Sequence, residues 1–167
     1  ILEDNGICNR PGAITNLPAG KVFVLPKEGT ATGRIVIDGS WEGEKLEKSI
    51  SILIEEGIIT DVSGDEKAEA IWQQLEDTRS GLRPSKAAMV GNLAEFGFGM
   101  NPRAKIIGNP LEDLVSRGAI YLGFGNNMAL GGTVNVPIHI RGVCRKATVA
   151  LEDVDLLVEG KVTAKVR

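Results

Sequence analysis

Histidine is nearly absent from this sequence, since His139 is the only one among 167 residues. Metal-dependent hydrolases hold their ions through several histidines and carboxylates. By itself, this chain therefore does not contain the side chains of a conventional two-metal hydrolase site. Cysteine is also scarce. Cys8 and Cys144 do not have the spacing of a Cys-x-x-Cys motif, which favours two reduced, structural thiols over a metal or redox pair.

Other absences exclude whole classes of protein. No apolar run approaches the roughly 18 to 20 residues of a membrane-spanning helix, and the N-terminus has no basic-then-apolar signal pattern. The net charge of -3 provides no basic stripe for nucleic acid. We therefore expect a cytoplasmic, folded protein with neither a membrane nor a nucleic acid as partner. The chain starts at Ile1 instead of a methionine, so we interpret it as part of a longer or processed protein.

Glycine is abundant, and the 21 glycines separate short apolar runs. Apolar alternation between turn residues predicts strands, here at 22–25, 34–37, 49–54, 58–62, 119–124, 134–140, 147–151, 156–158 and 161–162. Helical spacing of apolar residues predicts a helix at about 65–77, and Asn109 followed by a proline predicts a shorter one at 110–117. The fold class predicted is α+β, mostly antiparallel β-strands with one or two packed helices, in a single domain over 1–167.

Two Gly-Phe-Gly motifs, at 97–99 and 123–125, invite comparison with loops that hold phosphates. Neither has a third glycine at the required spacing before a helix, so the dinucleotide and P-loop interpretations fail. Tight turns and close approach of the backbone are the better interpretation. Phe98 and Phe124 are then expected to fill the core.

Two polar residues stand out in apolar surroundings. On a predicted strand, His139 and Arg141 point away from the face that carries Ile138 and Ile140. A lone histidine is more often a hydrogen-bonded structural group than a ligand. Glu95 lies in an apolar, glycine-rich segment, and a buried carboxylate needs a cation or a metal ion as partner. A structural salt bridge and a functional site stay open for it.

Four blocks of the sequence, in this order, resemble the C-terminal half of the aminopeptidase T family of metallo-aminopeptidases. Residues 16–23 are similar to that family's Asn-Leu-Pro-x-Gly-Glu-Val-Phe block, and residues 93–102 to its glutamate-containing block that ends in Asn-Pro. Residues 120–127 resemble a block that reads His-x-Ala-x-Gly, and residues 138–141 resemble a His-x-Asp block. The resemblance covers nearly the whole chain and implies the C-terminal half of a longer protein that forms a homodimer.

Carried over position by position, most of that family's metal ligands are replaced. Glu95 and His139 match ligands of the family, whereas Lys21, Tyr121 and Arg141 stand where it has a glutamate, a histidine and an aspartate. Two permanent cations would repel a pair of divalent ions, and a catalytic metal normally has at least three protein ligands. The resemblance thus implies a degenerate metal site.

Two classes of function are favoured, and no residue is assigned as catalytic. A scaffold or interaction module is a third possibility, which only the absence of a complete site supports. The first favoured class is an aminopeptidase T-like protein that is not an active peptidase. Its pocket is catalytically silent or repurposed for a small anionic ligand or a peptide, with Glu95 paired to Lys21. The ligand-binding residues are then Lys21, Glu95, Tyr121, His139 and Arg141.

The alternative is a metal-dependent aminopeptidase or another single-metal enzyme that the missing half or a partner subunit completes. Glu95 and His139 would then help to hold a divalent ion, with zinc, cobalt or manganese implied by the resemblance. Some relatives with altered ligands resemble oxygenases of small aromatic acids, so the reaction type is open.

Overall fold

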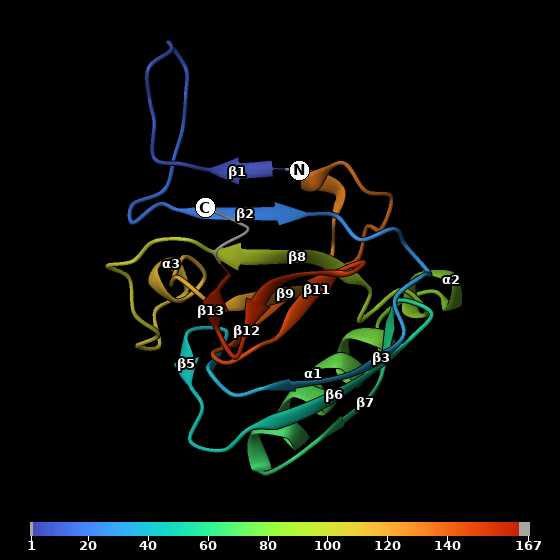
Figure 1. Cartoon of the computed structure of the whole chain (residues 1–167). Helices are drawn as coiled ribbons and strands as arrows, with labels where there is room; N and C mark the ends of the chain where they lie inside the picture. The colour runs from blue at the N-terminus through green and yellow to red at the C-terminus, as the bar shows by residue number, and fades with distance from the viewer. Residues whose placement is uncertain (1, 164–167) are drawn as a thin grey trace.

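The computed structural model describes residues 2–163, and antiparallel pairing dominates it. A seven-stranded sheet has the spatial order β1-β2-β8-β9-β10-β4-β5, and each neighbouring pair in it is antiparallel. Strands β1, β2 and β8 of this sheet lie side by side in Figure 1. Its strands are β1 (Leu2–Asp4), β2 (Lys21–Val24), β4 (Ser40–Trp41), β5 (Glu44–Lys45), β8 (Leu93–Gly99), β9 (Ile120–Gly125) and β10 (His139–Cys144).

Two smaller antiparallel sheets and three α-helices complete the described residues. The strands of the first sheet are β3 (Gly33–Ile37), β6 (Ile50–Glu55) and β7 (Ile58–Ser63), and those of the second are β11 (Val149–Leu151), β12 (Val154–Val158) and β13 (Lys161–Val162). The helices are α1 (Glu66–Ser80), α2 (Pro84–Ala87) and α3 (Pro110–Asp113), and a 3-10 turn, η1, spans Met128–Leu130. None of the described helices has the length and apolarity needed to cross a membrane.

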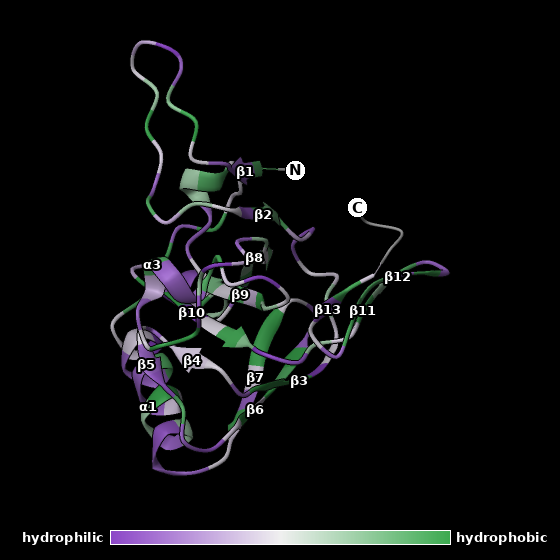
Figure 2. Cartoon of the chain, turned by 60° about the vertical axis from the view of Figure 1, so that its left-hand side comes forward, coloured by the Kyte–Doolittle hydropathy of each residue, from purple (hydrophilic) through white to green (hydrophobic). Residues whose placement is uncertain are grey.

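One apolar core joins the seven-stranded sheet, the β3-β6-β7 sheet and α1. On α1 the buried residues are Ala68, Ile71 and Leu75, whose spacing places them on one side of the helix. The rest of α1 is largely hydrophilic (Figure 2). Strand β6 buries alternate residues against the same core, as expected of a strand with one covered face.

The seven-stranded sheet presents different residues on its two faces. On β9, Ile120, Leu122 and Phe124 belong to the main core, whereas Tyr121 belongs to a separate, smaller apolar cluster. The smaller cluster also contains Leu114, Ala119 and Val143. We call the face that carries Tyr121 the outer face.

The structure confirms the predicted α+β class and most predicted elements, but it corrects several boundaries. The strand predicted at 134–140 is wrong in position, because pairing starts at His139; Pro137 has no N–H for a ladder. The helix predicted at 110–117 ends at Asp113. Beyond it, the backbone pairs with Asn101 instead, through the Val115 carbonyl and the Arg117 N–H.

The glycine-rich segment before residue 100 differs most from the sequence-based prediction. Gly97 and Gly99 lie inside strand β8, so the prediction of tight turns is wrong there, and α2 was not predicted. Close approach of the backbone is confirmed, because a Cβ on Gly99 would lie 2.0 Å from the carbonyl oxygen of Ser116. Phe124 is fully buried as predicted, while Phe98 is only partly buried.

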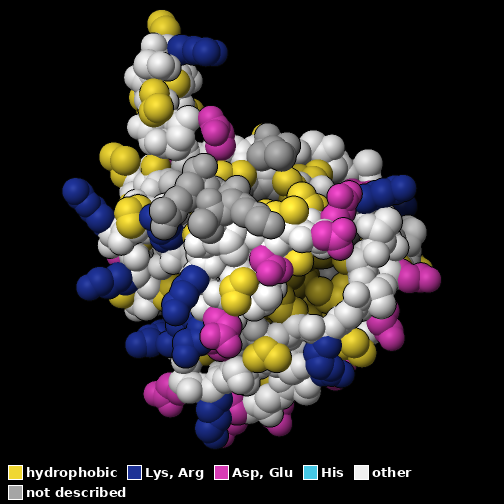
Figure 3. All heavy atoms as spheres, viewed as in Figure 1, with side chains coloured by type: hydrophobic (Ala, Val, Ile, Leu, Met, Phe, Trp, Pro, Cys, Tyr) yellow, Lys and Arg dark blue, Asp and Glu magenta, His cyan; other side chains and the backbone are white. Residues whose placement is uncertain are grey.

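The segment between β1 and β2 projects from the body of the molecule (Figures 1 and 3). It exposes hydrophobic side chains, among them Ile7, Ile14 and Leu17. Cys8 is exposed on the same segment, and Cys144 is buried; neither forms a disulfide, as predicted. Acidic and basic side chains are interspersed over the rest of the face in Figure 3, so no single-sign patch dominates it.

Candidate functional site

The five side chains singled out from the sequence come from four adjacent strands. Strand β2 carries Lys21, β8 carries Glu95, β9 carries Tyr121, and β10 carries His139 and Arg141. Strand register aligns them on the outer face, with Glu95 and Arg141 on opposite sides of Gly123. We call these five residues the polar cluster.

Glu95 is the centre of the polar cluster. Its carboxylate is almost fully buried, and each oxygen has a partner. The hydroxyl of Tyr121 donates to Oε1 at 2.7 Å, and Nε of Arg141 donates to Oε2 at 3.1 Å. The partner that a buried carboxylate requires is therefore Arg141, and the predicted Glu95–Lys21 pair is wrong.

These contacts determine the charge of Glu95. Burial by itself raises the pKa of Glu95, but the neighbouring His139, Tyr121 and Arg141 outweigh it and lower the pKa from 4.5 to about 2. The pKa of Tyr121 shifts in the opposite direction. Burial raises it, and the negative charge of Glu95 raises it further. At neutral pH the pair is a carboxylate that accepts from a neutral tyrosine.

His139 is held from one side by the backbone. Its Nδ1 lies 2.7 Å from the carbonyl oxygen of Asn126, so Nδ1 carries the proton, because a carbonyl only accepts. Its Nε2 is buried, lies 3.7 Å from Oε2 of Glu95, and has no hydrogen-bond partner in the described part of the chain. The ring thus contacts the carboxylate without a second hydrogen bond.

Lys21 is half-buried at the edge of the polar cluster. Its ammonium lies 5.2 Å from the ring centre of Phe23 and 5.8 Å from that of Tyr121, within the range of a cation–π contact. Burial lowers the pKa of Lys21, while the negative charges of Glu95 and Asp4 oppose that effect. Within residues 2–163 the ammonium forms no hydrogen bond or ion pair.

Two glycines make room for the cluster. A Cβ on Gly97 would lie 2.3 Å from Cζ of Tyr121, and a Cβ on Gly123 would lie 3.0 Å from Cβ of Glu95. Real Cβ atoms essentially never come as close as 2.3 Å to a side chain, so any larger residue at 97 displaces the tyrosine ring, and a Cβ at 123 would be tightly packed against Glu95. The two Gly-Phe-Gly motifs therefore serve the site, a role that sequence reasoning missed.

Sequence reasoning also missed two residues that position the cluster. The main-chain carbonyl of Asn126 orients the ring of His139. Because every residue has such a carbonyl, the sequence gives no signal for this contact. Glu42 accepts a hydrogen bond from the backbone N–H of Arg141. It lies 99 residues away in the sequence, and only the pairing of β10 with β4 brings it close.

The polar cluster does not fit a metal centre. Non-haem iron oxygenases typically hold iron with two histidines and a carboxylate, and this chain has one histidine. Among residues 2–163, no group of three or more His, Cys, Asp or Glu side chains is arranged to hold an ion. Two unit charges 4 Å apart interact by about 4 kcal/mol at an effective dielectric constant of 20, and a dication near Arg141 would double that repulsion.

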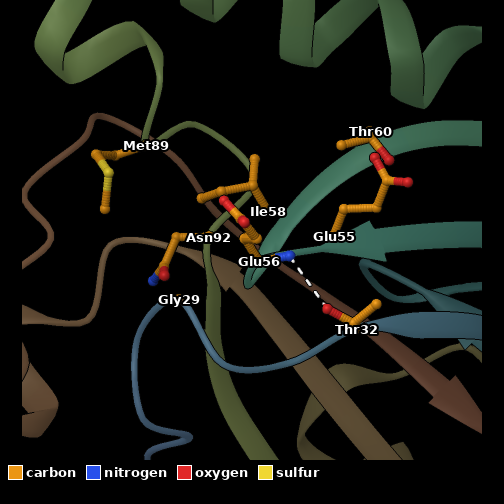
Figure 4. A pocket seen from close by; sticks show the side chains of 8 residues that line it. All are labelled: Gly29, Thr32, Glu55, Glu56, Ile58, Thr60, Met89 and Asn92. Atoms are coloured by element: carbon orange, nitrogen blue, oxygen red, sulfur yellow. Dashed lines mark hydrogen bonds between the residues drawn. The ribbon is translucent and has the colours of Figure 1, made fainter.

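A hollow of about 830 Å³ lies elsewhere, between the β6–β7 turn and the segments around Gly29 and Met89 (Figure 4). Its labelled side chains include Glu55, Glu56 and Asn92, and the N–H of Glu56 donates to Thr32. No residue of the polar cluster lines it. This hollow and the polar cluster are separate features.

Comparison with known proteins assigns the chain to a family. Residues 1–164 match the family NicX, described as 2,5-dihydroxypyridine 5,6-dioxygenase. The chain is 26% identical to the 2,5-dihydroxypyridine 5,6-dioxygenase of Pseudomonas putida (strain KT2440), over 98% of this chain and 48% of that protein. The structure of the 2,5-dihydroxypyridine dioxygenase from Pseudomonas putida KT2440 matches with a TM-score of 0.74 and 22% identity, over 85% of this chain and 43% of that chain.

These findings correct the sequence-based assignment. The aminopeptidase T resemblance is wrong, and with it the interpretation as an aminopeptidase-like hydrolase or a silent, repurposed pseudoenzyme, because the matching family and relative are dioxygenases. The chain spans about half the length of the curated relative that it matches. Because the family match extends over 1–164, the chain belongs to the NicX family of 2,5-dihydroxypyridine 5,6-dioxygenases.

Proposed function

We propose that the protein containing this chain is an oxygenase that reacts O₂ with a hydroxylated pyridine or a closely related hydroxylated ring. The observation that carries the proposal is the family match along 1–164. The Pseudomonas putida relative supports it, since that protein is named for the same class of reaction.

The polar cluster is the part of this chain that we assign to the substrate. A hydroxylated ring offers oxygen atoms as hydrogen-bond acceptors, and Lys21 and Arg141 offer N–H donors on the outer face. The polar cluster is also partly accessible, because 34% of the Arg141 side chain and 23% of the His139 side chain are exposed. Its role in the proposal is to bind and orient the ring.

The activation of O₂ is not assigned to the polar cluster. Its donor set does not fit an iron site of two histidines and a carboxylate, because the chain holds a single histidine. A metal ion used in the reaction would need ligands other than these five side chains. We therefore derive no chemical step through a metal from this chain.

Oxygen uptake tests the proposed function. The purified full-length protein is given 2,5-dihydroxypyridine in an oxygen electrode, with and without added ferrous iron, and unsubstituted pyridine serves as the control substrate. We expect uptake that requires the hydroxylated ring. Absence of uptake over a series of hydroxypyridines and catechols, with protein that circular dichroism shows to be folded, would contradict the proposal.

A matched pair of variants links the activity to the polar cluster. Glu95→Gln removes the buried charge that holds Arg141, whereas Glu47→Gln makes the same change at an exposed position. We expect the first to lower kcat/KM by at least tenfold and the second to leave it unchanged. A single domain over 1–167, a homodimer and a cytoplasmic location stay predictions from the sequence.

A further inference from the structure

We infer that Arg141, assisted by Lys21, binds a ring oxygen of the substrate directly and without a metal ion, and that Glu95 is the positioning residue for Arg141. The inference rests on the proposed function for the identity of the ligand. It concerns how this chain recognises that ligand.

The polar cluster has a surplus of hydrogen-bond donors. A guanidinium has five N–H donors, and within residues 2–163 the side chain of Arg141 uses one, from Nε to Glu95. The Lys21 ammonium uses none of its three in the same part of the chain. A site with free N–H donors complements a ligand with oxygen acceptors, especially an ionised hydroxyl, since charge-assisted hydrogen bonds are the strong ones.

The carboxylates around these donors are already engaged. Both oxygens of Glu95 accept hydrogen bonds, from Tyr121 and Arg141. Asp4, which faces Lys21 across β1 and β2, accepts from Thr15 at 2.6 Å and from Asn16 at 2.8 Å. The remaining N–H groups therefore lack a carboxylate that is free of other partners.

Glu95 determines where the guanidinium lies. The carboxylate is 2% exposed and is fixed by the Tyr121 hydroxyl on its other oxygen, so it is a rigid acceptor for Nε. A planar guanidinium held at Nε has a fixed orientation, and of the four N–H groups on its terminal nitrogens three point away from that contact. Glu42 fixes the backbone of Arg141 at the same time. Together these contacts orient the exposed part of Arg141 for a ligand.

A binding experiment without turnover tests this inference. The full-length protein is dialysed against EDTA, and 2,5-dihydroxypyridine is titrated under anaerobic conditions in a calorimeter. We expect binding to persist without metal. Arg141→Gln should weaken it 10- to 100-fold, as for the loss of a charged hydrogen bond, and Lys21→Gln by a smaller factor. Arg145→Gln is the matched control, because Arg145 contacts Asp38 and no member of the polar cluster.

A double-mutant cycle separates a positioning role for Glu95 from a structural one. If Glu95 acts through Arg141, then Glu95→Gln combined with Arg141→Gln binds no more weakly than Arg141→Gln alone. Additive losses in Kd would overturn the positioning role. Thermal unfolding of each variant verifies that it is folded.

Two further results distinguish this inference from the proposed function. Ligand binding that disappears in EDTA and returns with ferrous or cobalt ions, or wild-type affinity in Arg141→Gln, would overturn the inference while O₂ uptake stands. Metal-free binding that depends on Arg141, in a protein without O₂ uptake, would support the binding site and contradict the oxygenase.

Discussion

Replacing Glu95 by glutamine should change how the stability of the protein depends on pH. The carboxylate is 2% exposed, and its pKa is lowered from 4.5 to about 2 by its neighbours. A difference of that size between the folded and unfolded states corresponds to about 3 kcal/mol of stability. Because the folded pKa is the lower one, this contribution is fully present above about pH 5. It decreases as the pH falls from there toward 2.

The free energy of unfolding in urea measures this contribution for the wild type and Glu95→Gln between pH 7 and pH 3. We expect the difference between the two proteins to be largest near neutral pH and to fall to about half by pH 3. The other acidic groups are common to both proteins, so their titration cancels in the comparison. Glu47→Gln is the control, with no expected change in the pH profile. A difference that is constant over this range would refute the assignment of Glu95 as a charged, paired carboxylate.

Three further predictions concern packing, the thiols and a helix cap. Gly97→Ala places a Cβ 2.3 Å from the Tyr121 ring and should lower the free energy of unfolding by about 1–3 kcal/mol or more; an unchanged urea midpoint would contradict it. Cys8, which is exposed, should react with a thiol reagent in the folded protein, whereas Cys144 should not, because burial raises its pKa to about 12. Equal labelling rates would contradict that assignment. Asp65→Ala removes the cap of α1 and should cost about 1 kcal/mol in the same urea assay.

The fold class was predictable because local patterns carry it. The apolar residues that β6 buries alternate in the sequence, and Ala68, Ile71 and Leu75 of α1 recur there at helical spacing. Strand β8 was not predicted, because its glycines suggest turns. Inside the sheet, Gly97 leaves room for the ring of Tyr121, and Gly99 leaves room for the backbone at Ser116, which are both distant in the sequence.

The members of the candidate site were predictable, but their pairing was not. The unusual residue types at positions 21, 95, 121, 139 and 141 were visible in the sequence, and the structure brings them to one face of the sheet. The partner of Glu95 depends on register: Glu95 and Arg141 both lie opposite Gly123, and no local pattern contains that relation. The family was misassigned because short motif blocks were weighed by their similarity to another family's metal ligands.

Isotope labelling tests the central claim, that the protein containing this chain is a dioxygenase acting on a hydroxylated ring. The full-length protein reacts with 2,5-dihydroxypyridine under ¹⁸O₂, and mass spectrometry measures the label in the product. We expect the product to contain two ¹⁸O atoms, both from O₂, beside the unlabelled oxygens of the substrate. Conversion without ¹⁸O in the product, or product labelled only when the reaction is run in H₂¹⁸O, would contradict it.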